Sequence, residues 1–250
     1  MREIDLSLIV RSEKFLGCGT FGNCYLAYYR DILVAVKEFK AEKFGHDKMK
    51  KEVRHEAKMI SHLKDHRGVP LLFGIVTKNE PLSLITKFHG LKDKCVTLSN
   101  LIKKKKLNNP TWLGILKDII EALGRIHSSG ILHNDLKSNN VVMEQRKQEW
   151  NPVIIDFGKA RFCSDPKPVM SLLTVTQDKY RKRYPYIAPE IVNGSGRQSC
   201  ASDIYSLSKV VLAVLDLLPT VTSRSLRVAK SALCEKPDER PSPKDMLAML

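Results

Sequence analysis

A glutamate inside the apolar stripe of a predicted helix is the feature that most constrains how this sequence folds. Apolar residues of the segment 46–63 recur four and three residues apart, as on one face of an α-helix. They are Met49, Val53, Ile60 and Leu63. Glu56 fills the gap in this stripe. Because a buried charge without a partner is costly, this position requires a cation from a neighbouring element.

Lys37 is the candidate for that cation, because it lies on an alternating segment just before the helix. Residues 32–39 alternate between two faces, which predicts a β-strand. One face carries Ile32, Val34 and Val36, and the other carries Leu33, Ala35 and Lys37. A lysine of an edge strand exposed to water is the alternative interpretation. An ion pair between Lys37 and Glu56 is favoured, since it accounts for both charges at once.

The chain divides into a strand-rich first part and a helix-rich second part. Strands are predicted at residues 8–16, 23–29, 32–39, 69–76 and 82–88. Two later stripes have helical spacing. The first is Trp112, Ile115, Leu116, Ile119, Leu123 and Ile126, and the second is Ile204, Leu207, Val211, Val214, Leu215 and Leu218. We therefore expect two lobes, with a hinge near residues 86–90.

The composition excludes several classes of protein. Of the 250 residues, 43% are hydrophobic and 28% are charged, which is typical of globular proteins. No apolar run reaches the roughly 18 residues that span a membrane. The six cysteines form no Cys-x-x-Cys pair, so we expect neither a zinc site nor a disulfide framework. Reduced thiols indicate a cytoplasmic location, with the nucleus as the alternative.

The net charge of +15 is compatible with a nucleic acid or an anionic membrane surface as partner. However, the basic residues are scattered and no nucleic-acid-binding module is recognisable. A generally basic surface is therefore favoured, and we expect no specific nucleic-acid partner. The four consecutive lysines at residues 103–106 follow a short apolar segment and predict the solvated end of a helix.

Three short segments carry residues suited to phosphate chemistry. Residues 17–22 are Gly-Cys-Gly-Thr-Phe-Gly and precede an alternating strand, which favours a flap over phosphates rather than a dinucleotide-binding turn. In the next segment, Asp135 can orient a hydroxyl proton, Lys137 can neutralise transferred charge and Asn140 can ligate a metal. An apolar strand then ends at Asp156, which suits Mg²⁺. Each segment alone is also compatible with an ordinary turn or helix cap.

In this order, the segments resemble the signature of the eukaryotic protein kinases over almost the whole chain. The resemblance implies an α+β, bilobal protein-kinase fold. Its N-lobe, residues 1–87, would be a small antiparallel β-sheet with one main helix. Its C-lobe, residues 88–250, would be mostly helical with a shortened distal region, and the two lobes together would form one kinase domain. The sequence looks nearest to the tyrosine-kinase-like group of Ser/Thr kinases.

The resemblance also implies roles for single residues, with ATP and Mg²⁺ as cofactors and a protein as substrate. The residues around ATP would be Leu16, Gly17, Gly19, Gly22, Cys24, Ala35, Lys37, Glu56, Thr86, Phe88, His89 and Val142. Lys37 would bind the α- and β-phosphates, and Asp135 and Lys137 would act at the transferred phosphate. Asn140 and Asp156 would hold magnesium.

The same resemblance predicts contacts that support the site. Glu190 would pair with Arg240, and Asp203 would brace the catalytic loop, residues 133–140. The hinge would be residues 86–89, whose backbone would bond the adenine edge. Thr86 would be a small gatekeeper at the start of this hinge.

Four departures from the family pattern stand out. Asn134 replaces the arginine that usually clamps a phosphorylated activation-loop residue. Arg183 replaces a threonine that contacts the catalytic Asp and Lys, and its basic neighbourhood, residues 179–184, is interpreted as a solvated loop rather than a site for acidic substrates. Ser208 replaces a glycine, with no evident consequence. The stretch between Asp203 and Arg240 is unusually short.

Several functional alternatives remain at the level of sequence. Lys137, two residues after Asp135, is the Ser/Thr-type signal, and it favours serine and threonine acceptors over a tyrosine or dual-specificity kinase. A pseudokinase that binds nucleotide or partners as a scaffold is the main rival. Because all the key polar positions are filled, we expect a catalytically active protein kinase. The apolar ending, residues 246–250, is compatible with a fragment or a minimal kinase, and the oligomeric state is open.

Overall fold

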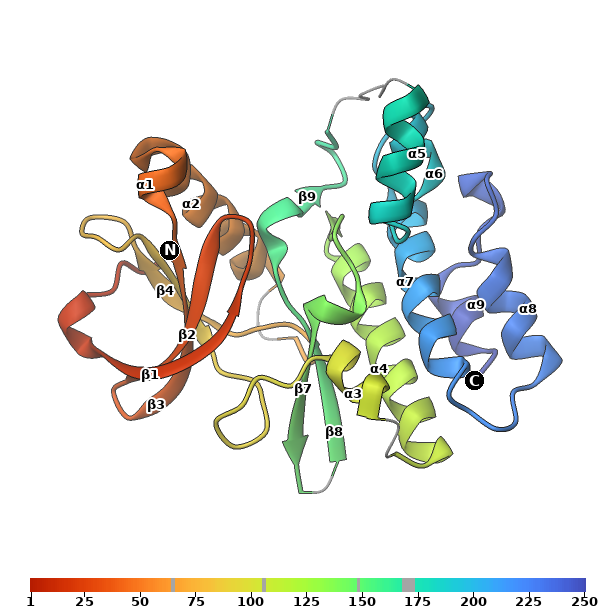
Figure 1. Ribbon diagram of the computed structural model, residues 1–250, viewed down its shortest axis with the longest axis horizontal. Helices are drawn as coiled ribbons and strands as arrows, with labels where there is room; N and C mark the ends of the chain where they lie inside the picture. Colours follow the sequence, from red (N-terminus) through yellow and green to blue (C-terminus); the bar gives the residue numbers. More distant parts are fainter. Residues whose placement is uncertain (64–65, 105–106, 148, 168–173) are drawn as a thin grey trace.

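The two-lobed α+β arrangement is visible in the computed structural model, which describes residues 1–63, 66–104, 107–147, 149–167 and 174–250. Figure 1 shows a twisted sheet with α1 and α2 at one end and a group of helices at the other. The N-terminus lies in the sheet-containing lobe and the C-terminus among the helices (Figure 1). The predicted fold class is confirmed.

The N-lobe is built on a five-stranded antiparallel sheet with strand order β1-β2-β3-β5-β4. Its strands are β1 (Ile9–Cys18), β2 (Gly22–Tyr29), β3 (Ile32–Phe39), β4 (Leu72–Val76) and β5 (Ser83–Lys87). All five were predicted, but β4 begins three residues later than expected. The reason is Pro70, because proline has no N–H to donate to the strand ladder.

Helix α2 (His46–Leu63) packs against this sheet, after the short helix α1 (Ala41–Phe44). The predicted stripe is buried, and Glu56 is buried within it at 3% exposure. The register of the sheet pairs Lys37 with Cys24 on β2, and Ala35 with Thr86 on β5. The helix and these three strands therefore bring the residues expected around ATP toward the same region.

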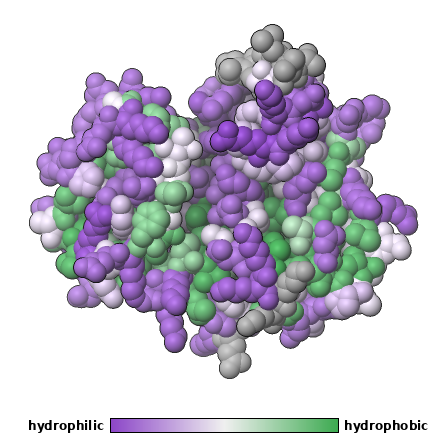
Figure 2. All heavy atoms as spheres, in the orientation of Figure 1, coloured by the Kyte–Doolittle hydropathy of each residue, from purple (hydrophilic) through white to green (hydrophobic). Residues whose placement is uncertain are grey.

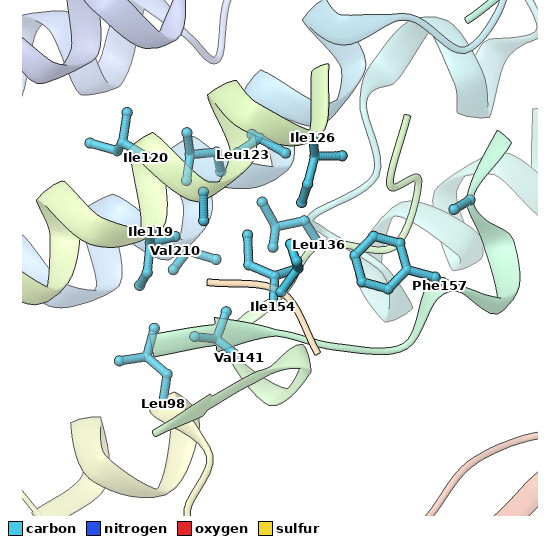
Figure 3. Packing of buried hydrophobic residues seen from close by; sticks show 14 of the residues in the cluster. Leu98, Ile119, Ile120, Leu123, Ile126, Leu136, Val141, Ile154, Phe157 and Val210 are labelled. Carbon is cyan, nitrogen blue, oxygen red and sulfur yellow. The ribbon is translucent and has the colours of Figure 1, made fainter. Parts of the chain in front are cut away.

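The C-lobe core forms around α4 (Asn109–Ser128) and α7 (Cys200–Leu215). Both predicted stripes are buried, including Leu218 just beyond the end of α7. Asn108 caps α4 by accepting a hydrogen bond from the Thr111 N–H at 2.9 Å. Figure 3 shows side chains of α4 facing Leu136, Ile154 and Phe157, so this core directly supports the segments that carry the polar site residues.

Shorter elements complete the described part of the C-lobe. The helices are α3 (Leu98–Lys104), α5 (Thr174–Arg183), α6 (Pro189–Asn193), α8 (Ser223–Ser231) and α9 (Pro243–Leu247). The strands form two pairs, β6 (Ile131–Leu132) with β9 (Arg161–Phe162) and β7 (Val141–Arg146) with β8 (Glu149–Ile154). Single 3₁₀ turns span Leu6–Leu8, Ser138–Asn140, Phe157–Lys159 and Pro237–Glu239.

The lysine run at residues 103–106 begins at the end of α3. Lys103 and Lys104 are exposed at the end of α3, as predicted, while Lys105 and Lys106 lie outside the described residues. Across the described ranges, none of the helices combines the length and the apolar character required to cross a lipid bilayer.

Buried polar contacts hold the short distal part of the C-lobe together. The Ser208 hydroxyl on α7 is fully buried and donates to the backbone oxygen of Ala229 on α8. This hydrogen bond gives Ser208 a structural role, which the sequence did not reveal. The guanidinium of Arg240 donates to both Glu190 oxygens, with Nη1–Oε1 and Nη2–Oε2 distances of 2.7 Å. The predicted pair between Glu190 and Arg240 is therefore confirmed.

We expect Arg240→Met to lower the thermal midpoint of unfolding strongly, because it leaves the Glu190 carboxylate buried without its cation. Breaking one side of such a pair costs about 3–5 kcal/mol, or roughly 6–20 °C in a domain of this size. Lys236→Met is the matched control, since the Lys236–Glu239 pair is exposed, and its loss should cost less than about 1 kcal/mol. Equal midpoints for the two variants in a calorimetric scan would contradict this assignment.

Candidate active site

A cavity of about 690 Å³ lies between the two lobes. On the N-lobe side it is lined by residues of β1, β2, β3 and α2. On the C-lobe side it is lined by residues of the segments 135–142 and 155–159. Every residue that the sequence analysis assigned to the site lines this cavity. Figure 2 shows an indentation in the outline between the two lobes, with hydrophilic residues on the side of the sheet-containing lobe. The predicted site residues are thus brought together from segments far apart in the sequence.

The predicted ion pair between Lys37 and Glu56 is present on the N-lobe side of the cavity. Lys37 Nζ lies 2.8 Å from Glu56 Oε2 and 3.1 Å from Oε1. The same ammonium lies 3.0 Å from Asp156 Oδ1. A strand of the sheet, the helix behind it and the segment after β8 therefore converge on one cation.

The charges in this cluster alter one another's protonation. Burial alone would lower the pKa of Lys37, but Glu56 and Asp156 outweigh it and raise the pKa above its usual range. Burial raises the pKa of Glu56 despite the nearby ammonium. Burial would also raise the pKa of Asp156, but Lys37 brings it below its ordinary value. The cluster therefore keeps a charged lysine and a charged aspartate at the cavity wall.

On the C-lobe side of the cavity lies the buried carboxylate of Asp135. Two lysines contact it, one at each oxygen. Lys137 Nζ lies 3.0 Å from Oδ2, and Lys159 Nζ lies 3.0 Å from Oδ1. The side-chain amide of Asn140 donates to the backbone oxygen of Asp135 at 2.9 Å and to Oδ2 at 3.3 Å. Asp135 is therefore fixed in place and its charge is compensated.

Asp203 on α7 holds the backbone of the catalytic loop, as predicted. Its Oδ2 accepts from the His133 N–H at 2.7 Å, and its Oδ1 accepts from the Asn134 N–H at 2.8 Å. Burial would raise the pKa of Asp203, but its hydrogen bond with His127 and the nearby His133 lower it. The backbone at Asn134 has a φ of 62°, a left-handed conformation that asparagine tolerates better than most residues. This bracing turns the loop toward the cavity.

The side chain of Asn134 forms a hydrogen bond with the protein backbone. Its side-chain amide donates to the backbone oxygen of Lys159 at 3.2 Å. The contact connects the catalytic loop to the turn that follows Gly158. Asn134 thereby helps to position the residue whose ammonium pairs with Asp135.

The side walls of the cavity beside the predicted hinge are mainly apolar. Cys24, Ala35 and Val142 line the cavity together with the hinge. One hinge group is already used, since the Phe88 N–H donates to the Leu33 oxygen at 3.2 Å. His89 Nδ1 lies 3.1 Å from Glu144 Oε2, and burial lowers the pKa of this imidazole. Flat apolar walls beside a polar edge are suited to an aromatic base.

The glycine-rich segment fits a flap over phosphates. The Gly19 N–H donates to the Gly22 oxygen at 2.8 Å, which closes a tight turn at its tip. A Cβ at Gly22 would lie only 2.5 Å from the Glu38 oxygen, so a larger residue cannot occupy this position without movement of the strand. Both contacts keep the backbone close to the cavity, where N–H groups can approach an anion.

The residues present fit a magnesium ion that is bound mostly by phosphate oxygens. Asn140 uses its amide N–H₂ for Asp135, so its oxygen is the atom available to a cation. The Asp156 side chain is 38% exposed, and its Oδ1 is the oxygen that contacts Lys37. In the described residues there is no cluster of three His, Cys, Asp or Glu that could hold a metal. One or two protein oxygens with phosphates is the arrangement that Mg²⁺ usually adopts.

Sequence reasoning missed several residues that line this cavity. The most important is Lys159, whose only signal was a basic residue directly after the Asp-Phe-Gly segment. Tyr186 was also missed, and its hydroxyl lies 3.5 Å from Lys137 Nζ. Cys95 and Thr97 line the cavity from the segment before α3. Nothing in the local sequence pattern distinguishes these two residues from an ordinary loop.

The interpretation of residues 179–184 as a loop is wrong in one respect. Most of this stretch belongs to helix α5, although its basic side chains are exposed as expected. Lysine, arginine and glutamine are good helix formers, which explains a helix without an apolar stripe. Tyr180 and Tyr184 line the cavity, with ring centroids 4.7 Å apart. Residues 168–173, which precede α5, lie outside the described residues.

Comparisons with known proteins agree with this arrangement. A family model described as the protein kinase domain matches residues 10–225. A "Probable serine/threonine-protein kinase" of Dictyostelium discoideum is 28% identical over 207 residues, which cover 81% of this chain and 46% of the relative. "Mitogen-activated protein kinase kinase kinase 3" of Arabidopsis thaliana is 26% identical over 211 residues, which cover 81% of this chain and 30% of that protein.

A third relative comes from a virus. It is a protein of Acanthamoeba polyphaga mimivirus named as a serine/threonine-protein kinase/receptor, 27% identical over 213 residues, which cover 84% of this chain and 12% of the relative. The chain thus spans less than half the length of each of these three relatives.

We expect Cys24 in the cavity to resist alkylation, because burial raises the pKa of its thiol to about 12. Since only the thiolate reacts, iodoacetamide at pH 8 should label Cys24 at least about a hundredfold more slowly than an ordinary exposed thiol. Peptide mass spectrometry measures both rates in the folded protein, and exposed Cys18 on the neighbouring strand is the internal reference. Labelling of Cys24 as fast as Cys18 would contradict the raised pKa of the Cys24 thiol.

Proposed function

The chain belongs to the protein kinase domain family, and on that premise we propose that it transfers the γ-phosphate of ATP, with Mg²⁺, to serine and threonine hydroxyls of proteins. The observation that carries the proposal is the convergence of Lys37, Asp135, Asn140 and Asp156 on one cavity. Phosphoryl transfer relies on positioning and electrostatic stabilisation. The cavity offers a fixed cation, two carboxylates and a neutral amide in suitable proximity.

Lys37 is proposed to hold phosphate oxygens at the upper wall. Its ammonium remains charged, because Glu56 and Asp156 raise its pKa. Glu56 fixes the direction of the side chain from behind, at 2.8 Å. Asn140 and Asp156 would hold the metal, which would neutralise charge that develops on the phosphoryl group transferred from ATP.

Asp135 is proposed to align the acceptor hydroxyl and to receive its hydrogen bond. Both of its oxygens contact lysine ammonium groups. Lys159 is the more exposed of the two lysines, at 46% against 29% for Lys137, so an incoming hydroxyl would displace Lys159 more readily. Lys137 would then stay beside the transferred phosphate, where a positive charge favours transfer.

Serine and threonine acceptors are favoured over tyrosine by two observations. Lys137 occupies the position that indicates a Ser/Thr kinase and contacts Asp135 directly. The relatives named above are serine/threonine kinases by name, or a kinase of the mitogen-activated cascade. The pseudokinase alternative has less support, because none of the polar positions around the cavity is lost. We also retain the division into an N-lobe of residues 1–87 and a C-lobe of residues 88–250 as a proposal.

Asp156→Asn tests the proposal, since it removes a charge at the metal position while it keeps the size of the side chain. We expect transfer of radiolabelled phosphate to a peptide array with serine, threonine and tyrosine acceptors to fall by at least about 10²–10³-fold. Lys37→Met should also inactivate the protein, but it leaves Glu56 buried and unpaired, so its effect on folding must be measured separately.

Asp216→Asn is the matched control, because Asp216 is exposed beyond the end of α7, and its rate should equal that of the unmodified chain. Full activity of a folded Asp156→Asn protein would overturn the proposed role. Stabilisation of the unmodified chain by ATP with Mg²⁺, without transfer to any acceptor, would favour the pseudokinase. Label confined to tyrosine would overturn the proposed acceptor.

We also expect activity to be independent of activation-loop phosphorylation through residue 134. Asn134 cannot pair with a phosphate as arginine does, and its amide already donates to Lys159. Treatment with a phosphatase should therefore leave the rate unchanged. A large loss would contradict this expectation and direct attention to a second hollow of about 300 Å³, whose lining includes Lys51, Arg161 and Lys167.

A further inference from the structure

Two cysteines meet beside the catalytic loop, outside the cavity described above. Cys163 directly follows β9, and its backbone N–H donates to the Gly130 oxygen at 2.8 Å. Cys200 is the first residue of α7. The two thiols lie within interaction range of each other, and both residues are exposed to solvent. Small oxidants can therefore reach this pair from outside.

A histidine and an aspartate form the inner side of the same cluster. His127 Nε2 lies 3.0 Å from Asp203 Oδ2, and the imidazole also interacts with the Cys200 thiol. Burial would lower the pKa of His127, but its hydrogen bonds to Asp203 and Cys200 raise it to about 9. At neutral pH, a positive imidazolium therefore lies against Cys200.

The two thiols differ in their tendency to ionise. The hydrogen bond with His127 lowers the pKa of Cys200, and the start of a helix acts in the same direction. Burial and the neighbouring Cys200 raise the pKa of Cys163 to about 11. Cys200 is thus the more readily ionised of the two cysteines, and Cys163 is the less readily ionised one beside it.

From this geometry we infer that Cys200 and Cys163 form a hydroperoxide-reactive thiol pair, in which Cys200 is oxidised first and Cys163 then closes a disulfide. The disulfide would join the segment after β9 to the first turn of α7. Nothing in this inference depends on phosphoryl transfer, since it concerns thiol chemistry outside the cavity.

The reaction balances in two steps. The Cys200 thiolate attacks the terminal oxygen of the hydroperoxide, so that an S–O bond forms, the O–O bond breaks and the leaving alkoxide takes a proton to become an alcohol. The sulfur of Cys163 then attacks the sulfur of Cys200. An S–S bond forms, and hydroxide leaves with the Cys163 proton as water. In total, two thiols and one hydroperoxide give one disulfide, one alcohol and one water.

The location of the pair connects it to the catalytic loop. Asp203, three residues after Cys200 on α7, holds the backbone N–H groups of His133 and Asn134. Oxidation consumes the Cys200 thiol beside His127 and introduces a covalent bond across the same cluster. The change acts on the groups that brace the loop and leaves the cavity-lining residues untouched.

The first experiment is oxidation of the purified full chain with hydrogen peroxide, followed by intact mass and peptide mapping. We expect loss of two hydrogens, a crosslink between the peptides that carry Cys163 and Cys200, and recovery with dithiothreitol. A crosslink between other cysteines, or none, would overturn the inference. This result is independent of kinase activity, so it can fail while the proposed function holds.

Single variants assign the two sulfurs. Cys163→Ser should stop the reaction at a Cys200 sulfenic acid, which dimedone traps, whereas Cys200→Ser should prevent oxidation of Cys163. Cys234→Ser is the control, because the Cys234 thiol donates to the Lys236 oxygen in another part of the C-lobe, and this variant should form the disulfide at the unmodified rate. Dimedone trapping at Cys163 in the Cys200→Ser variant would contradict the assigned order.

His127→Gln tests the source of reactivity while it keeps a hydrogen-bonding side chain. If the imidazolium activates Cys200, iodoacetamide labelling of Cys200 at pH 7 should slow by about tenfold, while labelling of Cys18 stays constant. Unfolding would instead accelerate labelling at half-buried Cys24, which reports on the fold in the same sample. An unchanged Cys200 rate in a folded variant would overturn the role of His127.

Discussion

The contact between Lys37 and Glu56 is the interaction on which the rest of the site depends. A helix can bury a glutamate only if a cation reaches it, and here that cation is 16% exposed and lies 2.8 Å away. The requirement fixes α2 against the sheet in one rotation and one height, because any other position leaves a charge unpaired. Asp156, 3.0 Å from the same ammonium, extends the constraint to the C-lobe. A single lysine thus relates both lobes to the cavity between them.

Asp203 is the buried charge that positions the catalytic loop on the C-lobe side of the cavity. Its two oxygens hold successive N–H groups of the catalytic loop, and His127 shares one of them. The loop is therefore supported from α7 through a buried carboxylate rather than through apolar packing alone. The hydrogen bonds of His127 reach Cys200 at the surface, so the same group that fixes the loop is connected to a solvent-accessible thiol.

Long-range pairing in this protein was predictable where burial of a charge demanded a partner. Glu56 in an apolar stripe and its cation Lys37 are the clearest case, and the two helical stripes of the C-lobe followed from periodicity. Contacts decided by tertiary turns were not predictable. Lys159 reaches Asp135 only because of the turn at Phe157–Lys159, and Ser208 meets Ala229 only because α8 folds back on α7. Helix α5 was missed because it has no apolar stripe to signal it.

Asn134, which stands where the family pattern has arginine, is connected by a hydrogen bond to Lys159. Asn134 lacks the positive charge that the family pattern places beside the catalytic aspartate, but its amide holds the backbone of Lys159 at 3.2 Å. The ammonium of Lys159 then lies 3.0 Å from Asp135. A positive charge is thus retained next to the catalytic loop, but it comes from the segment after Gly158 instead. Because this charge is permanent and needs no phosphate, it gives a physical basis for a loop that is organised without phosphorylation.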